Sequence, residues 1–539
     1  MPAAVRRSVR ERAGVHMPLP GITPLAVAGL CLIIWLPLGV MVWSGVTGGR
    51  LPRLDARFWS LTLRTLAVAG GSAGLAALIG LPLGLALGRL RLPGNALLRA
   101  VQVGPLLVPS YVSAIGWLHV LGRSGLLNRW IAGLLGLERA PLNVYSVGGA
   151  IWILGLSAFP LVTLPVLSGL EGIDAELEED VLLLGSRWDA LRYVTLPLIL
   201  PALLSGALLA FLVGLAEFAV PSFLSVNVYT VEVFARFAAF YDHAAGAAAA
   251  LPLLLIALAA FCAERWLAGR RPRVALDVPY GAPRGFDPGR WRILALVACS
   301  VPVTLAVAVP VLALACRAPS LSDYRFAWEV AYREVINSLL FAPCAATVAV
   351  VMALPIAWSI ARARIPASGQ LVEAASLLPV ALPGMLLGIG LIRIWNRPAP
   401  FVWMYQSPCI VILGQVARAL PFAVLCLAGR WGQIPVALEE AARIAGASSA
   451  RVLWSVLLPS LRSGLRAGWC LGLAAAMAEL QTTLLVYPPG AATLPVRIFT
   501  LQHDGQAENV AALCMIMTAM AVLPAAAAWT MGRREEDQS

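Results

Sequence analysis

The feature that most constrains this chain is a series of twelve apolar stretches, each long enough to cross a lipid bilayer. A transmembrane helix needs about 20 consecutive apolar residues, and a soluble core does not require so many such runs. Of the 539 residues, 13% are charged, whereas a typical soluble domain has about 25%. The stretches lie near residues 23–45, 62–88, 98–121, 146–170, 198–225, 244–267, 293–316, 335–361, 371–395, 408–429, 464–487 and 508–531. The sequence therefore predicts an all-α polytopic membrane protein with about 12 transmembrane helices.

The basic residues are unusual because all 40 are Arg and none is Lys. A P-loop needs a Lys to bind phosphate and a Schiff base needs a Lys amine, so both are excluded. The nine Cys form no CxxC pair, and the four His have no partner at ligand spacing. We therefore expect no metal site, no bound cofactor and no catalytic residue in this chain. If the protein works at the expense of ATP, a separate subunit must bind and hydrolyse it.

The distribution of Arg predicts the orientation of the chain. With the N-terminus in the cytoplasm, 25 Arg lie on the inner side and 14 on the outer side, while Arg418 falls within a span. This bias follows the positive-inside rule, so both termini are expected in the cytoplasm and the net charge of +12 reflects topology. Arg residues before the first stretch are also typical of a cleaved signal peptide. That stretch is long and no small-residue cleavage site follows it, which favours an uncleaved first span.

The two halves of the chain resemble each other. GRLRLP at 88–93 recurs as ARARIP at 361–366, and LEEDVLLLGSRWDALRYVTLP at 177–197 recurs as LEEAARIAGASSARVLWSVLLP at 438–459. Each half has six predicted spans, an even number, so the copies cross the membrane in the same sense, unlike inverted repeats. The predicted organisation is a cytoplasmic tail (1–22), a first half (23–267), a Pro-, Gly- and Arg-rich cytoplasmic linker (268–292), a second half (293–531) and a cytoplasmic tail (532–539).

One exposed amphipathic segment occurs in each half, between its fourth and fifth spans. We call these the first loop (171–197) and the second loop (431–459). In the second loop Glu440 lies near the start of a helical run, where the helix dipole favours an acid, and Gly446 permits a turn into a second helical stretch. The pattern predicts a short helix–turn–helix suited to docking into a groove of a partner. A plain connecting loop is the alternative, which the duplication disfavours.

The pattern Glu-Ala-Ala, three residues, Gly and then about a dozen residues to Leu-Pro resembles the EAA loop of binding-protein-dependent ABC transporter permeases, the type I importers. The second loop matches it at Glu440, Ala441, Ala442, Gly446, Leu458 and Pro459, and the first loop at Glu179, Gly185, Leu196 and Pro197. Asp180 and Val181 replace the two Ala in the first loop, which is also one residue shorter between Gly and Pro. We therefore expect the first loop to couple less tightly or to dock differently.

The resemblance extends over nearly the whole chain, because two permease halves fused in one polypeptide resemble the iron(III)-type permeases and their thiamine-type relatives. The phrases AEFAVPSFL (216–224) and LLVYPPGAATLPVRIFTL (484–501) are similar to the iron(III) branch. The resemblance implies a bacterial inner-membrane permease with two copies of a cytoplasmic ATPase, a substrate-binding protein outside, and alternating access. Related branches move thiamine, polyamines, phosphonates, sulfate and molybdate. A transporter driven by an ion gradient is an alternative, but it would not explain the two repeated loops. A membrane enzyme is a further alternative, but it would need clusters of reactive residues that the sequence lacks.

Three ionisable residues are candidates for the translocation path, because charged groups within spans are costly and usually functional. Glu217 and Glu479 occupy matching places in the fifth span of each half, where two carboxylates can attract a cation. The alternative is that each lies near the outer end of its span and reaches water. Arg418, a turn before Pro421, is predicted to face the same cavity or to pair with an acid; its counterpart in the first half is Ser157.

Overall fold

The computed structural model describes residues 22–48, 54–138, 141–173, 175–239, 243–269, 285–363, 366–504 and 507–536, and it shows a helical protein. The helices of the first half are α2 (Ile22–Leu30), η1 (Cys31–Trp35), α3 (Leu36–Thr47), α4 (Ala56–Arg89), α5 (Asn95–Val101), α6 (Gly104–Leu107), α7 (Ser110–Leu121), α8 (Leu126–Leu135), α9 (Val147–Ala158), α10 (Pro160–Glu171), α11 (Ala175–Leu184), α12 (Arg187–Ala190), η2 (Leu191–Thr195), α13 (Leu196–Ala216), α14 (Ala219–Phe223), α15 (Tyr229–Phe234), η3 (Ala235–Ala239) and α16 (His243–Gly269). Those of the second half are η4 (Gly289–Trp291), α17 (Arg292–Val303), η5 (Thr304–Ala308), α18 (Val309–Arg317), α19 (Leu321–Ala361), α20 (Pro366–Ala381), α21 (Gly384–Trp395), α22 (Phe401–Tyr405), α23 (Cys409–Gly432), α24 (Val436–Ile444), α25 (Ser449–Val452), η6 (Leu453–Leu457), α26 (Leu458–Ser460), α27 (Arg462–Ala478), α28 (Gln481–Val486), α29 (Leu494–Asp504) and α30 (Ala507–Glu536).

The apolar stretches of the sequence become membrane-length helices. Within the described residues, nine helical runs are long and apolar enough to cross a membrane, and two bent helix pairs raise the number to eleven. The remaining predicted span, 464–487, corresponds to α27 and α28. With 17 residues, α27 is about 25 Å long at 1.5 Å per residue, somewhat less than the hydrocarbon thickness of a bilayer. The prediction of a polytopic helical membrane protein is confirmed.

Several of the predicted spans contain a break. The third and ninth spans bend by 90° and 101°, where α7 and α21 begin after Pro109 and Pro383. The fifth span of each half ends at Glu217 or Glu479, and the short helices α14 and α28 follow. The apolar stretches 198–225 and 464–487 therefore each contain a break that hydropathy does not reveal. Broken helices are tolerated at membrane depth where protein surrounds the freed backbone groups.

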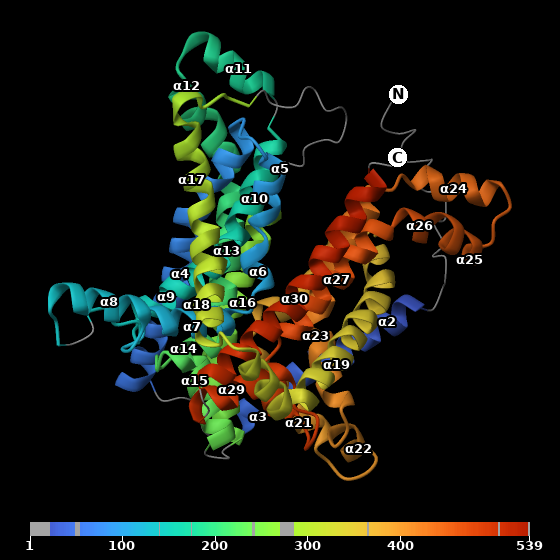
Figure 1. Ribbon diagram of the computed structural model, residues 1–539. Helices are drawn as coiled ribbons and strands as arrows, with labels where there is room; N and C mark the ends of the chain where they lie inside the picture. Colours follow the sequence, from blue (N-terminus) through green and yellow to red (C-terminus); the bar gives the residue numbers. More distant parts are fainter. Residues whose placement is uncertain are drawn as a thin grey trace.

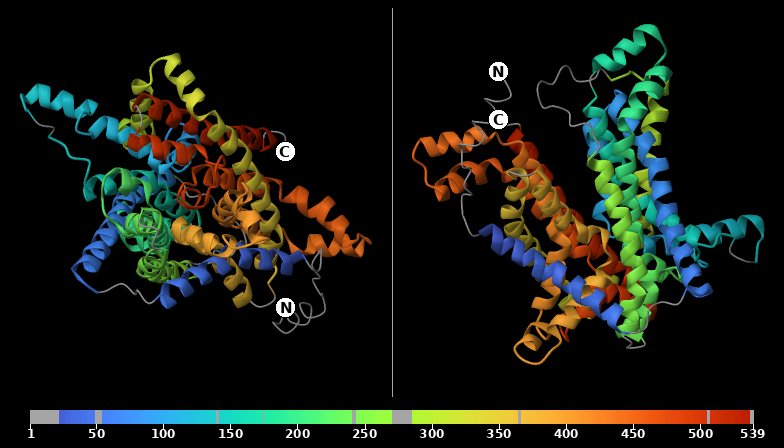
Figure 2. Two further views of the ribbon diagram at one scale, coloured as in Figure 1. Left: turned by 90° about the horizontal axis from the view of Figure 1, so that it is seen from below. Right: turned by 180° about the vertical axis from the view of Figure 1, so that it is seen from behind.

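The helices form two arms that separate toward one end of the molecule (Figure 1, Figure 2). The helices α11 and α12 lie at the tip of one arm and α24 to α26 at the tip of the other, so we call this the loop end. At the opposite end α14, α15 and α29 lie together, and we call it the aromatic end for reasons given below. The molecule is thus spread at the loop end and joined at the aromatic end.

The first span of each half packs in the arm of the other half. From the first half, α2 packs against α19 and α3 against α21, while α18 of the second half packs against α7. Where α3 crosses α21, and where α18 crosses α7, a glycine of one helix lies against a proline of the other. A Cβ on Gly390 would lie 2.1 Å from the carbonyl oxygen of Pro37, and a Cβ on Gly116 would lie 2.6 Å from that of Pro310. Only glycine permits such close approach of two helices. Both halves therefore carry the glycine that lets the first span of the other half pack against them.

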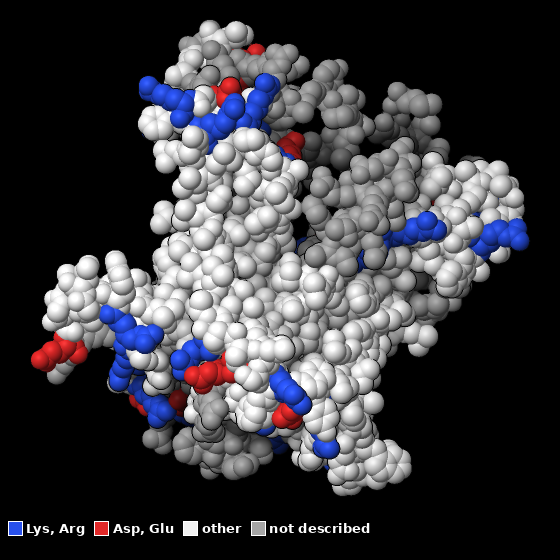
Figure 3. Space-filling view, viewed as in Figure 1, with Lys and Arg blue, Asp and Glu red and all other residues white. Residues whose placement is uncertain are grey.

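The surface agrees with a position in a bilayer. On the face seen in Figure 3, a broad band without charged side chains covers the arm that contains α4, α10 and α17. Charged side chains gather above and below that band. This is the distribution expected when hydrocarbon chains contact the middle of the protein and water contacts its ends.

Candidate functional site

The second loop folds as two short helices with a turn at Gly446. The N–H of Gly446 donates to the carbonyl of Arg443 at 2.9 Å, and the N–H of Ala447 donates to that of Ala442 at 3.1 Å. These two bonds form a Schellman motif, in which the residue after the helix adopts a left-handed conformation. Gly446 has a φ of +82°, which glycine adopts at little cost. The predicted helix–turn–helix is confirmed for this loop.

The first loop makes its turn by other means. Gly185 does not adopt a positive φ. Instead Ser186 and Asp189 cap α12 reciprocally: the N–H of Ser186 donates to Asp189 Oδ2 at 2.8 Å, and the N–H of Asp189 donates to Ser186 Oγ at 3.3 Å. Hydrogen bonds from Ser186 hold the pKa of Asp189 below its ordinary value of 3.8. The shorter spacing in the first loop therefore corresponds to a different turn.

Both loops present a strongly exposed apolar side chain at the same position of the helix before the turn. Leu183 in α11 is 83% exposed and Ile444 in α24 is 88% exposed, and both stand six residues after the Leu that opens the repeated segment. On α24, Glu440 and Ala441 are exposed as well, whereas Ala442 is half-buried. The loop surface is therefore amphipathic and free to contact another protein.

The other predicted loop residues are Glu179, within α11, and the two Leu-Pro pairs, each at the start of a helix. Glu179 is in α11, and its side chain is outside the described part of the structure. Leu196 and Pro197 begin α13, and Leu458 and Pro459 begin α26. Each helix continues a π-helical turn, η2 or η6: the N–H of Leu196 donates to the carbonyl of Leu191, and the N–H of Leu458 to that of Leu453. The role of these residues in coupling stays a prediction.

Sequence reasoning missed a buried acid in each loop. Glu178 is 7% exposed, and its Oε1 accepts hydrogen bonds from Arg89 Nη2 at 2.8 Å and from Thr195 Oγ1 at 2.7 Å. Glu439 is 2% exposed and accepts from Arg362 Nη2 at 2.8 Å. The repeat carried the signal, because the two Arg lie in the phrases GRLRLP and ARARIP and the two Glu in the repeated loop segments. Each loop is thus fixed to the end of the second span of its own half.

Glu217 and Glu479 lie where the fifth spans break. Glu217 accepts the N–H of Ala219 at 2.9 Å and the hydroxyl of Ser110 at 2.8 Å. Glu479 accepts the N–H of Thr482 at 2.7 Å. Each carboxylate therefore caps the short helix that follows the break. Glu479 is only 6% exposed, so it does not simply reach water.

Arg418 and Tyr111 complete what we call the central cluster, together with Glu217 and Glu479. Arg418 donates hydrogen bonds to the carbonyls of Pro379 and Leu382, close to the bend between α20 and α21. Tyr111 is 3% exposed, and its hydroxyl has no hydrogen-bond partner among the described residues. Ser110, the neighbour of Tyr111, donates to Glu217, and Thr482, whose N–H donates to Glu479, bonds to the carbonyl of Gly384 at the same bend. The structure thus brings the three predicted path residues together, and it adds a tyrosine that no sequence pattern indicated.

Rings from both halves meet beside the central cluster. We call them the aromatic cluster: Phe218, Phe223 and Phe234 from the first half and Phe499 and His503 from the second. The ring centroids are 5.4 Å apart for Phe218 and Phe499, and 5.9 Å apart for Phe223 and His503. Such separations are typical of favourable aromatic pairs. The cluster therefore holds the two halves together at the aromatic end.

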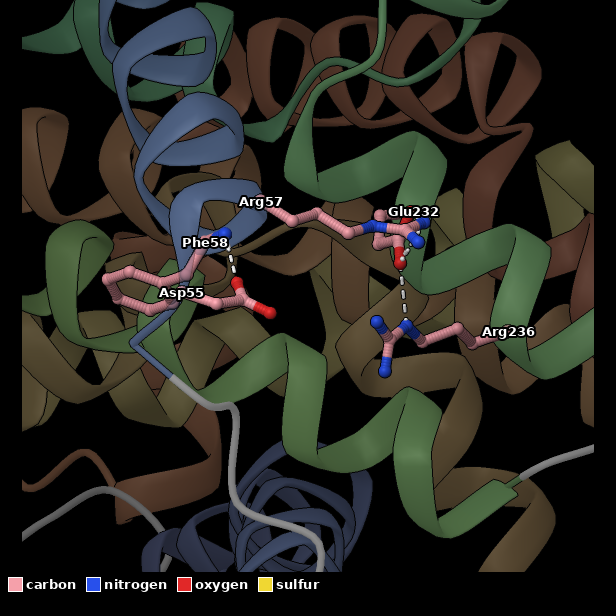
Figure 4. A network of polar contacts seen from close by, with 5 residues as sticks. All are labelled: Asp55, Arg57, Phe58, Glu232 and Arg236. Carbon is pink, nitrogen blue, oxygen red and sulfur yellow. Dashed lines mark hydrogen bonds and ion pairs between the residues drawn. The ribbon is translucent and has the colours of Figure 1, made fainter.

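An ion-pair network lies at the start of α4. Figure 4 shows Glu232 of α15 between Arg57 of α4 and Arg236, with contacts of 2.8 and 2.7 Å. Asp55 caps α4 by accepting the N–H of Phe58 at 2.8 Å. Partial burial acts to raise the pKa of Glu232, but the two arginines outweigh it and hold that pKa below 4.5.

Known proteins resemble this chain over most of its length. Residues 80–273 match the family "Binding-protein-dependent transport system inner membrane component". The Fe(3+)-transport system permease protein FbpB 2 of Haemophilus influenzae is 24% identical over 437 residues, which are 79% of this chain and 80% of that protein. The thiamine transport system permease protein ThiP of Salmonella typhimurium is 25% identical over 426 residues, 76% of this chain and 78% of that protein.

A shorter relative is more similar in sequence. The molybdenum transport system permease protein ModB of Escherichia coli is 34% identical over 165 residues, which are 30% of this chain and 69% of that protein. All three relatives are named as permease proteins, and their names give different solutes. The chain therefore belongs to the family of binding-protein-dependent transport system inner membrane components and is a multi-pass permease of an ABC importer.

Proposed function

We propose that the chain is the permease of an ATP-driven importer for iron(III), which works with two copies of a cytoplasmic ATPase and with a substrate-binding protein outside. A relative that aligns over 79% of the chain is named as an Fe(3+) permease. The central cluster supports the same choice, because carboxylate oxygens suit hard, highly charged cations. In this proposal the loop end faces the cytoplasm.

The observation that carries the coupling part of the proposal is the matched exposure of Leu183 and Ile444. An apolar side chain that is more than four-fifths exposed at the same position of both repeated loops supports a surface that is completed by a partner. Each loop docks one ATPase subunit, with its amphipathic helix in a groove of that subunit. The chain has no Lys for a P-loop, so ATP acts through these contacts.

The arrangement of the arms supports alternating access. The arms are spread at the loop end and joined at the aromatic end (Figure 1), so this conformation opens toward the cytoplasm. When ATP draws the two ATPase subunits together, the loops follow and the arms close. The aromatic cluster then separates and opens the path to the outside.

Docking is tested by replacing both exposed side chains, as Leu183→Asp with Ile444→Asp. We expect the ATPase to be lost from the purified complex while the chain still inserts in the membrane. Leu321→Asp is the matched control, because Leu321 is 85% exposed at the start of α19, away from the loops. Full ATPase recovery in the double variant would contradict docking at this surface.

The substrate is tested in proteoliposomes that contain this chain, its ATPase and its binding protein. We expect ATP-dependent uptake of radiolabelled iron(III), with no competition from thiamine, a polyamine, a phosphonate, sulfate or molybdate. Uptake of one of those solutes in place of iron would still support an ATP-driven importer, but it would overturn the assignment of iron(III) as its substrate. Uptake driven by an ion gradient without the ATPase would overturn the importer itself.

A further inference from the structure

The second span of each half forms side-chain bonds near both of its ends: to the loop at one end, and to α15 or α29 at the other. These spans are α4, with 34 residues, and α19, with 41 residues. At 1.5 Å per residue, α4 is about 51 Å long and reaches from one end of the molecule to the other. In α19 the chain kinks at Ala331, and the residues after it keep helical angles to Ala361, including at Pro343 and Pro355.

At the loop end each of these helices binds the loop of its own half through a buried ion pair. Arg89, the last residue of α4, binds Glu178, and Arg362, directly after α19, binds Glu439. The side chains of both pairs are at most 10% exposed. A buried charge is costly unless it is paired, so each Glu is held firmly to its Arg.

At the aromatic end the same two helices bind α15 and α29. Thr65 Oγ1 on α4 accepts the N–H of Tyr229, the first residue of α15, at 3.0 Å. Ser338 Oγ on α19 accepts the N–H of Leu494, the first residue of α29, at 2.8 Å. Both hydroxyl side chains are buried.

The four contacts form two equivalent sets. Thr65 and Ser338 are separated by the same 273 residues as Arg89 and Arg362. Two salt bridges add to the contacts at the aromatic end: Arg57 with Glu232 at 2.8 Å (Figure 4), and Arg497 with Glu334 at 3.9 Å. The helices α15 and α29 also carry Phe234 and Phe499 of the aromatic cluster.

We propose that α4 and α19 are the links that carry movement of the loops to the aromatic cluster, with Glu178, Glu439, Thr65 and Ser338 as positioning residues. A loop that is moved by its ATPase moves the Arg to which it is bonded. Because a helix resists bending over this length, the far end of the span moves too and takes α15 or α29 with it. The rings of the aromatic cluster then part. This inference rests on the proposed ATPase coupling and names the residues that transmit it.

The readout is a disulfide across the aromatic cluster, formed by Phe223→Cys with His503→Cys, whose rings lie 5.9 Å apart. The background is a chain in which the nine native cysteines are replaced by alanine and ATP-driven uptake is retained. The complex with the ATPase is oxidised with and without ATP plus vanadate. In this parent we expect the nucleotide to lower the disulfide yield severalfold.

Two double variants break the links at opposite ends. Glu178→Gln with Glu439→Gln removes the charge of both ion pairs, and Thr65→Val with Ser338→Ala removes both hydroxyls far from the ATPase. We expect both to bind the ATPase and hydrolyse ATP but to lose the nucleotide-dependent fall in disulfide yield. If the first variant fails to assemble, the second still decides, because its changes do not touch the loops.

Matched controls keep the result specific. Glu373→Gln breaks the ion pair of Arg265 with Glu373 at 2.8 Å, which does not involve the loops. Thr347→Val removes a hydroxyl on α19 that bonds to Pro343 of the same helix and to Trp469. Both controls should respond to nucleotide like the parent. A full response in both link variants would overturn the inference, whereas a parent that responds to no nucleotide would overturn the proposed function.

Discussion

Gly446 shows at the scale of one residue how the second loop depends on its backbone. Its φ of +82° lies in the left-handed region, and a Cβ there would meet no atom within 4 Å. The obstacle to substitution is therefore the backbone alone, which costs about 1–2 kcal/mol for an ordinary residue and more for a β-branched one.

We predict that Gly446→Val inserts in the membrane but loses co-purification of the ATPase and substrate-stimulated ATP hydrolysis. Gly446→Asn is the control, because Asn tolerates a left-handed conformation and should keep most of the coupling. Gly185→Val should be milder, since Gly185 lacks a positive φ; the added Cβ would lie 3.1 Å from Asp189 Oδ2, so that side chain must shift by only a few tenths of an ångström. Equal coupling in Gly446→Val and Gly446→Asn would contradict this account of the turn.

The carboxylates of the central cluster make a second prediction. Gln keeps one oxygen that can accept a hydrogen bond, so Glu217→Gln with Glu479→Gln removes two charges and retains one accepting oxygen at each cap. At position 479 one cap bond is lost, because Glu479 accepts the N–H of Thr482 with Oε1 and that of Thr483 with Oε2. If the carboxylates attract a cation, ATP-driven uptake should fall severalfold while the ATPase still co-purifies. Glu508→Gln, which breaks an exposed pair with Arg317, is the control. Normal uptake in the double variant would leave the two acids as helix caps only.

At the scale of an element, α15 is fixed to α4 by an ion-pair network with a predictable dependence on pH. The pKa of Glu232 is lowered in the folded protein. Its contribution to stability is therefore fully present above the pKa of the unfolded chain, near 4.5, and is lost as the pH falls through the lowered folded value.

We predict that Glu232→Gln lowers the melting temperature of the detergent-solubilised protein by an amount that does not change between neutral pH and about pH 5. Below that range the two proteins should converge, because the acid in the parent becomes protonated. Thermal unfolding of both proteins across the pH series is the measurement. A difference that vanished already near neutral pH would mean that Glu232 is not held ionised by its two arginines.

The elements differ in how far the sequence could predict them. Hydropathy located the spans, because a run of apolar residues is a local property. It could not locate the breaks at Glu217 and Glu479, since these depend on N–H groups and carboxylates that meet only after folding. The turn at Gly446 was predictable from glycine itself. The pairing of Arg89 with Glu178 was not, because periodicity does not identify partners 89 residues apart.

For the whole molecule, the excess of Arg predicts that the loop end faces the cytoplasm. A reporter fused after Gly281 in the linker, or at either terminus, should therefore have cytoplasmic activity. Gly281 and the two termini lie outside the described residues, so the prediction rests on the count of 25 Arg against 14. A reporter fused at Leu321, at the start of α19, should give the opposite signal. Periplasmic activity at the linker would contradict both the twelve-span topology and the parallel duplication.

The exchange of first spans means that the peptide bonds of the linker are not what unites the halves. The first span of each half packs against the other half, through the contacts of Pro37 with Gly390 and of Pro310 with Gly116. Two separately expressed chains, 1–275 and 276–539, should therefore associate and purify together. Removal of residues 1–48 from the first should weaken this association without abolishing it, because α18 still packs against α7 and the aromatic cluster still joins the halves. Continuity of the polypeptide then fixes only the ratio of the halves at one to one, while the interlocked helices supply the cohesion.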